Sequence, residues 1–201
     1  MLKLLKVAIT GGIAAGKSTV CFLLKAHGAY AVDADSIVHE LLNSNQILCK
    51  QVIELLGKDI LTHNQIDRSK VATKVFDNVD KLKAYEKIIH PYVFKEIEAL
   101  YQTVESQRSH TLFVVELPLL FEAKAENEFD YIITVAASDE ECIKRLEKKG
   151  LSRESYEKRK KRLLSLEQKM QKSDFVINND GSLEDLKEQV DQITKKITIT
   201  P

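Results

Sequence analysis

A glycine-rich motif near the start of the chain constrains the fold most strongly. Residues 11–18 read GGIAAGKS and match the pattern GxxxxGK[ST] at every fixed position. The motif follows the apolar run Lys6–Thr10, which predicts a β-strand, and it opens the helical stretch Gly16–His27. A glycine-rich turn in this position lets backbone N–H groups surround a phosphate at the helix N-terminus. The motif therefore predicts a P-loop that binds a nucleotide.

The fixed residues of this motif are those that handle phosphate. Lys17 is expected to reach the β- and γ-phosphates of ATP, and the Ser18 hydroxyl is expected to ligate Mg²⁺. An ordinary glycine-rich turn is the alternative, but the position between a strand and a helix favours the nucleotide. The residues expected to contact the nucleotide here are Gly12, Ile13, Ala14, Ala15, Gly16, Lys17, Ser18 and Thr19.

Short apolar runs alternate with longer helical stretches along the whole chain. Several of these runs show little polar alternation, which is typical of parallel strands covered on both faces. Strands and crossover helices in this order predict an α/β fold, with a five-stranded parallel sheet inside a three-layer P-loop domain. The predicted strands are Lys6–Thr10, Ala29–Val32, Thr111–Leu117, Tyr131–Ala136 and Phe175–Asn178, and the predicted helices are Gly16–His27, Ser36–Gly57 with a break at 43–45, Ser69–Phe76, Val79–Gln107, Asp139–Lys149, Arg153–Lys172 and Ser182–Ile197.

Two helical stretches are longer than a crossover between strands requires. In an open α/β sheet, ligands bind beyond the carboxyl ends of the strands, and both stretches can close over that edge. We therefore interpret the chain as a single P-loop domain. Its parts are a core of residues 1–35, 111–143 and 173–201, a helical acceptor-binding region at 36–110 and a lid at 144–172.

Positive charge is concentrated in the lid. The chain as a whole is neutral, but residues 144–172 contain 12 lysines and arginines against 4 acidic residues. A local basic patch on a neutral protein indicates a particular anionic ligand and argues against general nucleic-acid binding. Lids of small-molecule kinases use arginines to neutralise the transferring phosphoryl group and to exclude water, whereas a solvated helix face is the alternative. The candidates are Arg145, Arg153, Arg159 and Arg162.

Cysteine content and hydropathy bear on location. The three cysteines are odd in number and far apart, so they form neither a disulfide framework nor a metal-binding pair, which indicates a reducing compartment. No apolar run approaches the roughly 18 residues of a membrane span. The first residues resemble a signal peptide only superficially, because they lead directly into the glycine turn. We expect a cytoplasmic protein without nucleic-acid or membrane partners, and nothing in the sequence indicates an obligate protein partner.

Two aspartates stand at the carboxyl end of the second predicted strand, directly after Val32. Asp33 and Asp35 are alternate residues, so their carboxylates are expected to project to the same side, toward the phosphates. Phosphoryl transfer needs a group that orients the acceptor hydroxyl and takes its proton, and an aspartate suits that role. The alternative is that Asp35 caps the helix beginning at Ser36.

The third core strand ends in ELPLLFE. Glu116 occupies a position where P-loop proteins often keep an acidic residue for the Mg²⁺ shell, although that residue is usually Asp. Pro118 is expected to end the strand and to stiffen the following loop. Glu122 either contacts the ligand or caps the next turn.

Three more polar positions have both a functional and a structural interpretation. His90 precedes Pro91, which is expected to break or kink the long helix and to move the imidazole out of helical geometry. A histidine at such a break either donates to a phosphate or is a structural residue of the kink. Arg68 is either a phosphate clamp or a solvated helix end. Asn178, in the sequence INNDG at the end of the fifth strand, either contacts the adenine or belongs to an ordinary turn.

Taken in order, these segments resemble the dephospho-CoA kinase family. The resemblance covers most of the chain and lies in TGGIAAGKST, VDAD, IDR with a following VF, IIHP, ELPLLFE, KRLEKKGLS and SDFVINNDGS. The P-loop is shared by a very large superfamily, whereas DAD, HP, PLLFE and VINNDG in this order are more specific. The resemblance implies a P-loop core, a helical coenzyme A-binding region and a lid.

The resemblance also implies residue roles. Asp35 matches the family's proposed base, His90 lies in its acceptor-binding region, and Arg145 and Arg159 lie in its lid. The residues expected to act in catalysis are Asp35, Lys17 and Arg145, and those expected to contact the acceptor are Asp33, Asp35, Arg68, His90, Pro118 and Leu119.

The chain departs from the family pattern in the lid and just before it. Cys142 and Leu163 stand where the family commonly has glutamine, and Lys148 or Lys149 stands where an arginine is expected. These changes bear on the detailed lid contacts and leave the P-loop and the DAD segment untouched.

The implied reaction is phosphorylation of the ribose 3′-hydroxyl of dephospho-CoA by ATP with Mg²⁺, the last step of coenzyme A synthesis. The nearest alternative is another P-loop kinase, acting on a nucleoside, a nucleoside monophosphate or shikimate. A nucleotide-switched regulatory protein is the alternative from another class. The sequence contains no N/TKxD-type segment for guanine recognition, which argues against such a switch.

Overall fold

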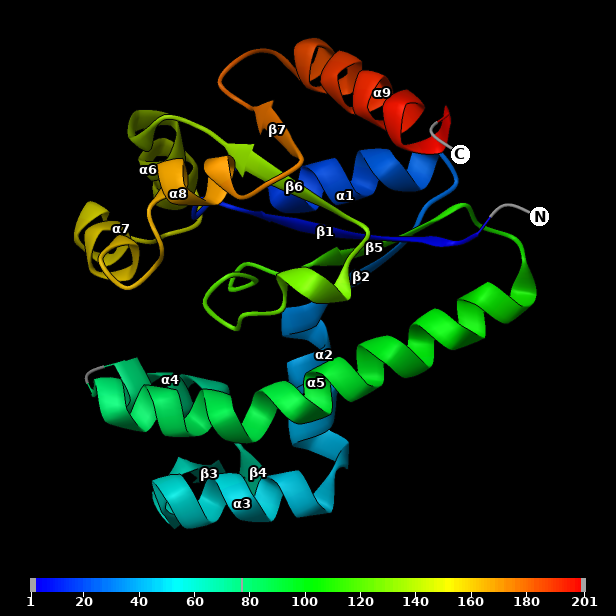
Figure 1. Cartoon of the computed structure of the whole chain (residues 1–201). Coiled ribbons are helices and arrows are strands. Elements are labelled where there is room, and N and C mark those ends of the chain that lie inside the picture. Colours follow the sequence, from blue (N-terminus) through cyan, green and yellow to red (C-terminus); the bar gives the residue numbers. More distant parts are fainter. Residues whose placement is uncertain (1–2, 77, 200–201) are drawn as a thin grey trace. The chain divides into compact units, whose positions relative to one another are not determined.

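The structure is a computed structural model that describes residues 3–76 and 78–199 (Figure 1). It contains two compact units. The first unit joins the chain up to Val32 with the chain from Tyr101 onward, and the second unit is Asp33–Leu100. The division therefore falls at the end of the second strand and inside the long helix that precedes the third core strand.

The first unit is built around a five-stranded sheet. Strand β1 (Leu5–Gly11) pairs in parallel with β5 (Leu112–Glu116) on one side and with β6 (Tyr131–Ala136) on the other. β6 also pairs in parallel with β7 (Phe175–Asn178), and β2 (Tyr30–Asp33) lies beside β5. The strand order is therefore β2-β5-β1-β6-β7. The five-stranded parallel α/β fold is thereby confirmed.

The apolar strands are covered on both faces, which is why they lack polar alternation. Val7 and Ile9 of β1 join one buried cluster with residues of α1 (Lys17–Ala26) and α9 (Leu183–Ile199). These two helices lie side by side over one face of the sheet (Figure 1). Full burial of one such side chain stabilises the fold by roughly 1.5–3 kcal/mol.

The basic segment after β6 folds as three short helices. The prediction of a single helix across Arg153–Lys172 is wrong, because the chain leaves the helix and starts again from a new N-cap. The side chain of Ser165 accepts the N–H of Gln168, and the Gln168 side chain accepts the N–H of Ser165, which forms a capping box. These three helices are α6 (Asp139–Glu147), α7 (Arg153–Lys160) and α8 (Leu166–Gln171). A short 3₁₀ helix, η2 (Glu126–Glu128), lies before β6.

The second unit is helical and contains one small hairpin. The predicted break at 43–45 is confirmed, since Asn45 accepts the N–H of Leu48 and caps a new helix. The antiparallel hairpin was not predicted; it turns at His63 and Asn64, whose φ angles are 49° and 62°. Strands of two residues are too short to show a pattern. The elements are α2 (Ala34–Ser44), α3 (Gln46–Leu56), η1 (Lys58–Ile60), β3 (Leu61–Thr62), β4 (Gln65–Ile66), α4 (Arg68–Phe76) and α5 (Val79–Gln107), whose last turns belong to the first unit.

The long helix α5 runs through Pro91 without a break. The expectation that His90 leaves helical geometry is therefore wrong. A proline inside a helix costs about 3 kcal/mol, and the burial of Ile89, Val93 and Ile97 along one face of α5 offsets that cost. Although α5 has 29 residues, no helix within 3–76 and 78–199 is long and apolar enough to cross a membrane.

Candidate active site

The glycine-rich motif forms the turn between β1 and α1. Gly11 and Gly16 have φ angles of 138° and 103°, which favour glycine. A Cβ atom on Gly11 would lie 2.1 Å from the carbonyl oxygen of Val135, so no side chain fits there. Lys17 is buried, and its Nζ donates a hydrogen bond to the carbonyl oxygen of Gly12 at 2.8 Å. The ammonium group is thereby held against the loop whose N–H groups would bind phosphate.

Ser18 and Glu116 meet beside the P-loop. The Ser18 hydroxyl donates a hydrogen bond to Oε1 of Glu116 at 3.1 Å. Parallel pairing of β1 with β5 brings them together, because Glu116 lies opposite Ile9 in the register. Hydroxyl and carboxylate oxygens are donors that Mg²⁺ prefers, and Mg²⁺ bound with nucleotide phosphates needs only one or two protein oxygens. The donor set fits the Mg²⁺ implied by the motif.

Asn179 and Arg145 fasten the end of the P-loop. Nδ2 of Asn179 donates to the carbonyl oxygen of Ala15 at 2.7 Å, and Nη1 of Arg145 donates to the same oxygen at 3.2 Å. Nη2 of Arg145 also donates to the carbonyl oxygen of Asn179 at 2.7 Å. A Cβ atom on Gly16 would lie 2.2 Å from Nδ2 of Asn179. The two side chains therefore tie the segments after β6 and β7 to the phosphate loop.

This geometry bears on two residues singled out from the sequence. Arg145, expected as a lid arginine acting on phosphate, directs two guanidinium nitrogens at backbone carbonyls. Asn178, expected to contact the nucleotide, is exposed, and its backbone N–H and C=O pair with the side chain of Gln189. Its buried neighbour Asn179 is the one that contacts the P-loop. Asn178 is the last residue of β7 and Asn179 is the first residue after it, and the composition of the segment does not distinguish the two asparagines.

Replacing Asn179 by aspartate is expected to raise the Kd for ATP by about tenfold. The variant places a carboxylate oxygen against the Ala15 carbonyl and removes a buried hydrogen bond, at a cost of roughly 1–3 kcal/mol. Asn178→Asp is the matched control, because that neighbouring side chain is exposed. Titration of both proteins with a nonhydrolysable ATP analogue measures the two values. A larger rise of the Kd in the Asn178→Asp protein would contradict this prediction and would indicate that Asn178 contacts the nucleotide.

The loop after β5 uses its backbone carbonyls within the protein. The Pro118 carbonyl oxygen accepts hydrogen bonds from the Thr10 hydroxyl at 3.2 Å and from Nζ of Lys169 at 2.8 Å. The Leu119 carbonyl oxygen accepts the N–H of Ala123 at 2.9 Å. The side chains of Pro118 and Leu119, which are half-buried, could still contact an acceptor.

In the second unit, Asp33 rather than Asp35 caps α2. The Asp33 carboxylate accepts the N–H of Asp35 at 3.0 Å and the Ser36 hydroxyl at 2.8 Å. The interpretation of Asp35 as the helix cap is therefore wrong. Asp35 lies in the first turn of α2 with an exposed side chain, and its carboxylate does not serve as the cap.

Tyr85 lies within electrostatic range of Asp35 and Arg68 in this unit. Burial raises the pKa of Tyr85 to about 12, while the charge of Arg68 lowers it and that of Asp35 raises it. Asp35 and Arg68, two of the predicted acceptor contacts, are therefore close enough to change the pKa of the Tyr85 hydroxyl. Tyr85 itself was not singled out from the sequence. Asp67 caps the helix that Arg68 begins, and hydrogen bonds from Ser69 lower the pKa of Asp67 to about 2.

His90 is half-buried in α5. Burial holds the pKa of His90 below its ordinary value, so the imidazole is neutral at neutral pH. Its ring lies edge-on to Phe94, with ring centroids 6.2 Å apart. A neutral imidazole still donates one N–H, so His90 can bind a polar group without carrying charge.

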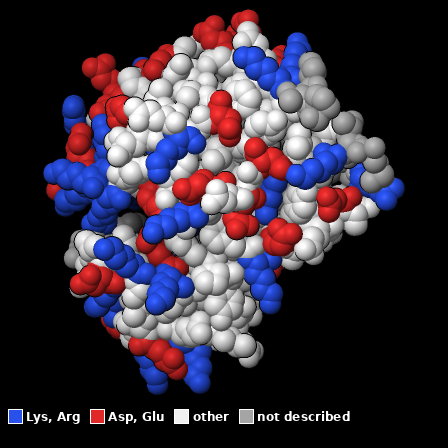
Figure 2. All heavy atoms as spheres, in the orientation of Figure 1, with Lys and Arg blue, Asp and Glu red and all other residues white. Residues whose placement is uncertain are grey.

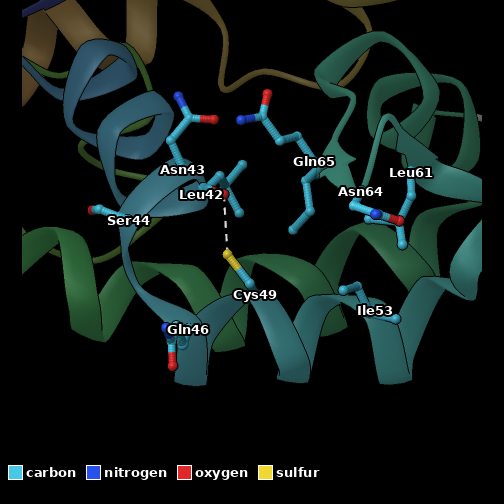
Figure 3. Close-up of a pocket in the computed structure, with 10 residues that line it drawn as sticks. Leu42, Asn43, Ser44, Gln46, Cys49, Ile53, Leu61, Asn64 and Gln65 are labelled. Atoms are coloured by element: carbon cyan, nitrogen blue, oxygen red, sulfur yellow. Dashed lines mark hydrogen bonds between the residues drawn. The ribbon is translucent and has the colours of Figure 1, made fainter.

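A pocket opens elsewhere in the second unit, between the end of α2, the start of α3 and the hairpin (Figure 3). The side-chain amides of Asn43 and Gln65 point toward each other across it, and Sγ of Cys49 donates to the carbonyl oxygen of Leu42 at 3.0 Å. None of the predicted acceptor contacts lines this pocket. It is therefore separate from the groups around Tyr85.

The lid carries a dense basic surface. Lysines and arginines gather over α7 and its surroundings (Figure 2). Three of them, Lys158, Arg159 and Lys160, occupy the last turn of α7, and Arg153 and Arg162 are also exposed. This part of the first unit can meet an anionic ligand.

One departure from the family pattern lies in α6, just before the lid. Cys142 is buried, which raises the pKa of its thiol, and it lies near Tyr156 of α7. The Tyr156 hydroxyl donates to Oδ1 of Asp139 at 2.7 Å. The small apolar side chain of Cys142 thus belongs to the packing of α6 against α7.

Comparison with known proteins agrees with this geometry. A family model of dephospho-CoA kinase matches residues 5–185. A dephospho-CoA kinase of Protochlamydia amoebophila is 43% identical over 201 residues, which cover 99% of each chain. The crystal structure of TT1252 from Thermus thermophilus has a TM-score of 0.81 at 30% identity, and the match covers 98% of this chain and 99% of that chain. A dephospho-CoA kinase from Campylobacter jejuni has a TM-score of 0.70 at 26% identity, and the match covers 96% of this chain and 97% of that chain. The chain therefore belongs to the dephospho-CoA kinase family.

Proposed function

We propose that this protein transfers the γ-phosphate of ATP to the ribose 3′-hydroxyl of dephospho-CoA, giving ADP and coenzyme A. The main support for dephospho-CoA as the acceptor is the similarity to the Protochlamydia enzyme over 99% of the chain. The Lys17 bond to Gly12 and the Ser18–Glu116 contact in the P-loop support ATP as the donor.

In the proposed mechanism the P-loop holds the donor. Backbone N–H groups at the start of α1 and the Lys17 ammonium bind the β- and γ-phosphates. Ser18 and Glu116 would hold Mg²⁺, which when bound neutralises charge that develops on the phosphates. Arg145 and Asn179 act through the loop, by fixing its end. Alignment and electrostatics supply most of the acceleration, because phosphoryl transfer requires no covalent intermediate.

The acceptor side of the mechanism rests on the second unit and the lid. Asp35 would accept the proton of the ribose hydroxyl, and its position beside the Asp33 cap supports that role. Arg68 would pair with an acceptor phosphate, and His90 would donate an uncharged hydrogen bond. The exposed lid arginines would offset charge on the transferring group. The remaining proposed acceptor contacts are Asp33, Pro118 and Leu119.

We also propose that the protein acts in the cytoplasm, without nucleic acid or an obligate protein partner. Cys21, Cys49 and Cys142 are free thiols, which suits a reducing compartment. The net charge of zero supplies no general attraction to nucleic acid.

Dephospho-CoA is expected to be the best acceptor in an assay of ADP release with ATP and Mg²⁺. Mass spectrometry should show the gain of one phosphoryl group. AMP, dTMP and shikimate are expected to be far poorer acceptors, because they lack the pantetheine arm whose binding energy helps to align the hydroxyl. Efficient phosphorylation of AMP or dTMP, with dephospho-CoA inert, would refute the acceptor and leave the P-loop kinase assignment in place.

The same assay tests the contact of His90 with the acceptor. His90→Ala is expected to raise the KM for dephospho-CoA more than the KM for ATP. His39→Ala is the matched control, because His39 is an exposed histidine of the same unit. An equal rise of both KM values would remove His90 from the acceptor site.

A further inference from the structure

A lysine is buried in the lid's last helix. Lys169 of α8 is 1% exposed, and its Nζ lies 3.0 Å from Oε1 of Glu122. The same ammonium donates a hydrogen bond to the carbonyl oxygen of Pro118 at 2.8 Å. Lysine is almost never fully buried without a partner, because its charge loses hydration. The carboxylate and the carbonyl together compensate for that loss.

Glu122 also holds a second part of the lid. Its Oε1 accepts the backbone N–H of Leu164 at 2.9 Å. Leu164 lies between α7 and α8, shortly after Arg159 and Arg162. The other oxygen, Oε2, is buried and has no hydrogen-bond partner in the part of the chain that the structure describes. One carboxylate thus fixes both the segment after the lid arginines and the helix that follows it.

The cluster extends to the P-loop. The Pro118 carbonyl that binds Lys169 also accepts the hydroxyl of Thr10, a fully buried residue of β1 just before the glycine turn. Pro118 follows Glu116 by two residues, and Glu116 contacts Ser18 of the P-loop. Hydrogen bonds that run from Thr10 through Pro118, Lys169 and Glu122 to Leu164 therefore connect the carboxyl end of β1 with the end of the lid.

We propose that Glu122 and Lys169 are positioning residues for phosphoryl transfer, whose ion pair sets the place of the lid arginines relative to the P-loop. This inference rests on the proposed kinase function. An apolar pair of similar volume would serve stability about as well, because the loss of hydration offsets much of the attraction between buried charges. The directional bonds to Pro118 and Leu164 fix orientation, and a misplacement of about 1 Å near a reacting group costs on the order of 10²-fold in rate.

Three variants separate positioning from stability: Glu122→Gln, Lys169→Met and the double variant Glu122→Leu/Lys169→Met. Each single change breaks the buried pair and is expected to lower the Tm. The double variant removes both charges and is expected to regain most of the Tm, but its kcat should stay at least about tenfold below that of the wild type. Glu184→Leu/Lys187→Met, which removes an exposed pair of α9, is the control and should change neither quantity.

Trypsin digestion gives a second readout that needs no acceptor. A nonhydrolysable ATP analogue is expected to protect the lid in the wild type and to protect it less in the double variant, at a temperature where circular dichroism shows both folded. If dephospho-CoA proves inert while this protection still depends on the ion pair, the acceptor assignment fails and the positioning role stands. Cleavage is followed at the exposed basic residues Lys158, Arg159, Lys160, Lys161 and Arg162.

Wild-type kcat and wild-type protection in a folded double variant would overturn the proposal, because the pair would then contribute to stability alone. If the double variant does not fold, Glu122→Gln decides the question at a temperature where it is folded. A loss of about tenfold in its kcat/KM for ATP supports positioning, and an unchanged value overturns it.

Discussion

Replacement of Lys17 by alanine is expected to lower kcat by roughly 10³-fold while the protein stays folded. Lys17 is 8% exposed, and its ammonium is held against the P-loop by the hydrogen bond to Gly12. Its charge contacts the phosphates in the proposed mechanism, and alanine supplies no charge in its place. Alanine is the best helix former and suits the first residue of α1, so the helix is retained. Steady-state kinetics, with circular dichroism and Tm on the same samples, check both parts.

Lys25→Ala is the matched control for this experiment. Lys25 lies in the last turn of the same helix with an exposed side chain, so its variant should keep the wild-type kcat. A folded Lys17→Ala protein with near-normal turnover would contradict the P-loop mechanism.

The second large effect is expected from Asp35→Asn. Asparagine keeps the size of the side chain but does not take up a proton as a carboxylate does, so kcat should fall by about 10²-fold or more while the Kd for ATP stays unchanged. The helix should be unaffected, because Asp33 caps α2. Single-turnover transfer and ATP titration, measured separately, test the two statements.

Asp33→Asn is the comparison variant for this prediction. Asparagine caps a helix about as well as aspartate, so α2 should remain intact and kcat should fall less than in Asp35→Asn. If Asp33→Asn instead loses more turnover, the proton acceptor is Asp33, and Asp35 is only a residue of the first helical turn.

The sheet and the P-loop were predictable because their signals are local. Each strand of a parallel sheet is buried on both faces, so Lys6–Thr10 and Tyr131–Ala136 appear as short apolar runs in the sequence. The P-loop needs glycine where backbone approaches backbone, and Gly11 meets Val135 at a distance that excludes any side chain. Such constraints act on a few adjacent residues and are visible without knowing what lies around them.

The predictions from the sequence were wrong where contacts between residues distant in the sequence override the local preference for a secondary structure. Pro91 was expected to interrupt α5, but burial of the flanking apolar residues keeps the helix continuous. The lid was expected to hold one helix across Arg153–Lys172, but Glu122, far away in the sequence, binds the N–H of Leu164 in the segment between α7 and α8. A backbone N–H that is hydrogen-bonded to a side chain distant in the sequence does not require a helical carbonyl as its partner.

The sequence by itself determined that this chain builds a parallel α/β sheet with a P-loop, and it singled out Lys17, Ser18 and Asp35. Only the tertiary structure decided which of two adjacent asparagines binds the P-loop and which carboxylate meets the buried Lys169. The physical reason is that periodicity and turn chemistry report on neighbours along the chain. A hydrogen bond between residues 164 positions apart, such as that from Asn179 to Ala15, exists only once the strands have taken their order in the sheet.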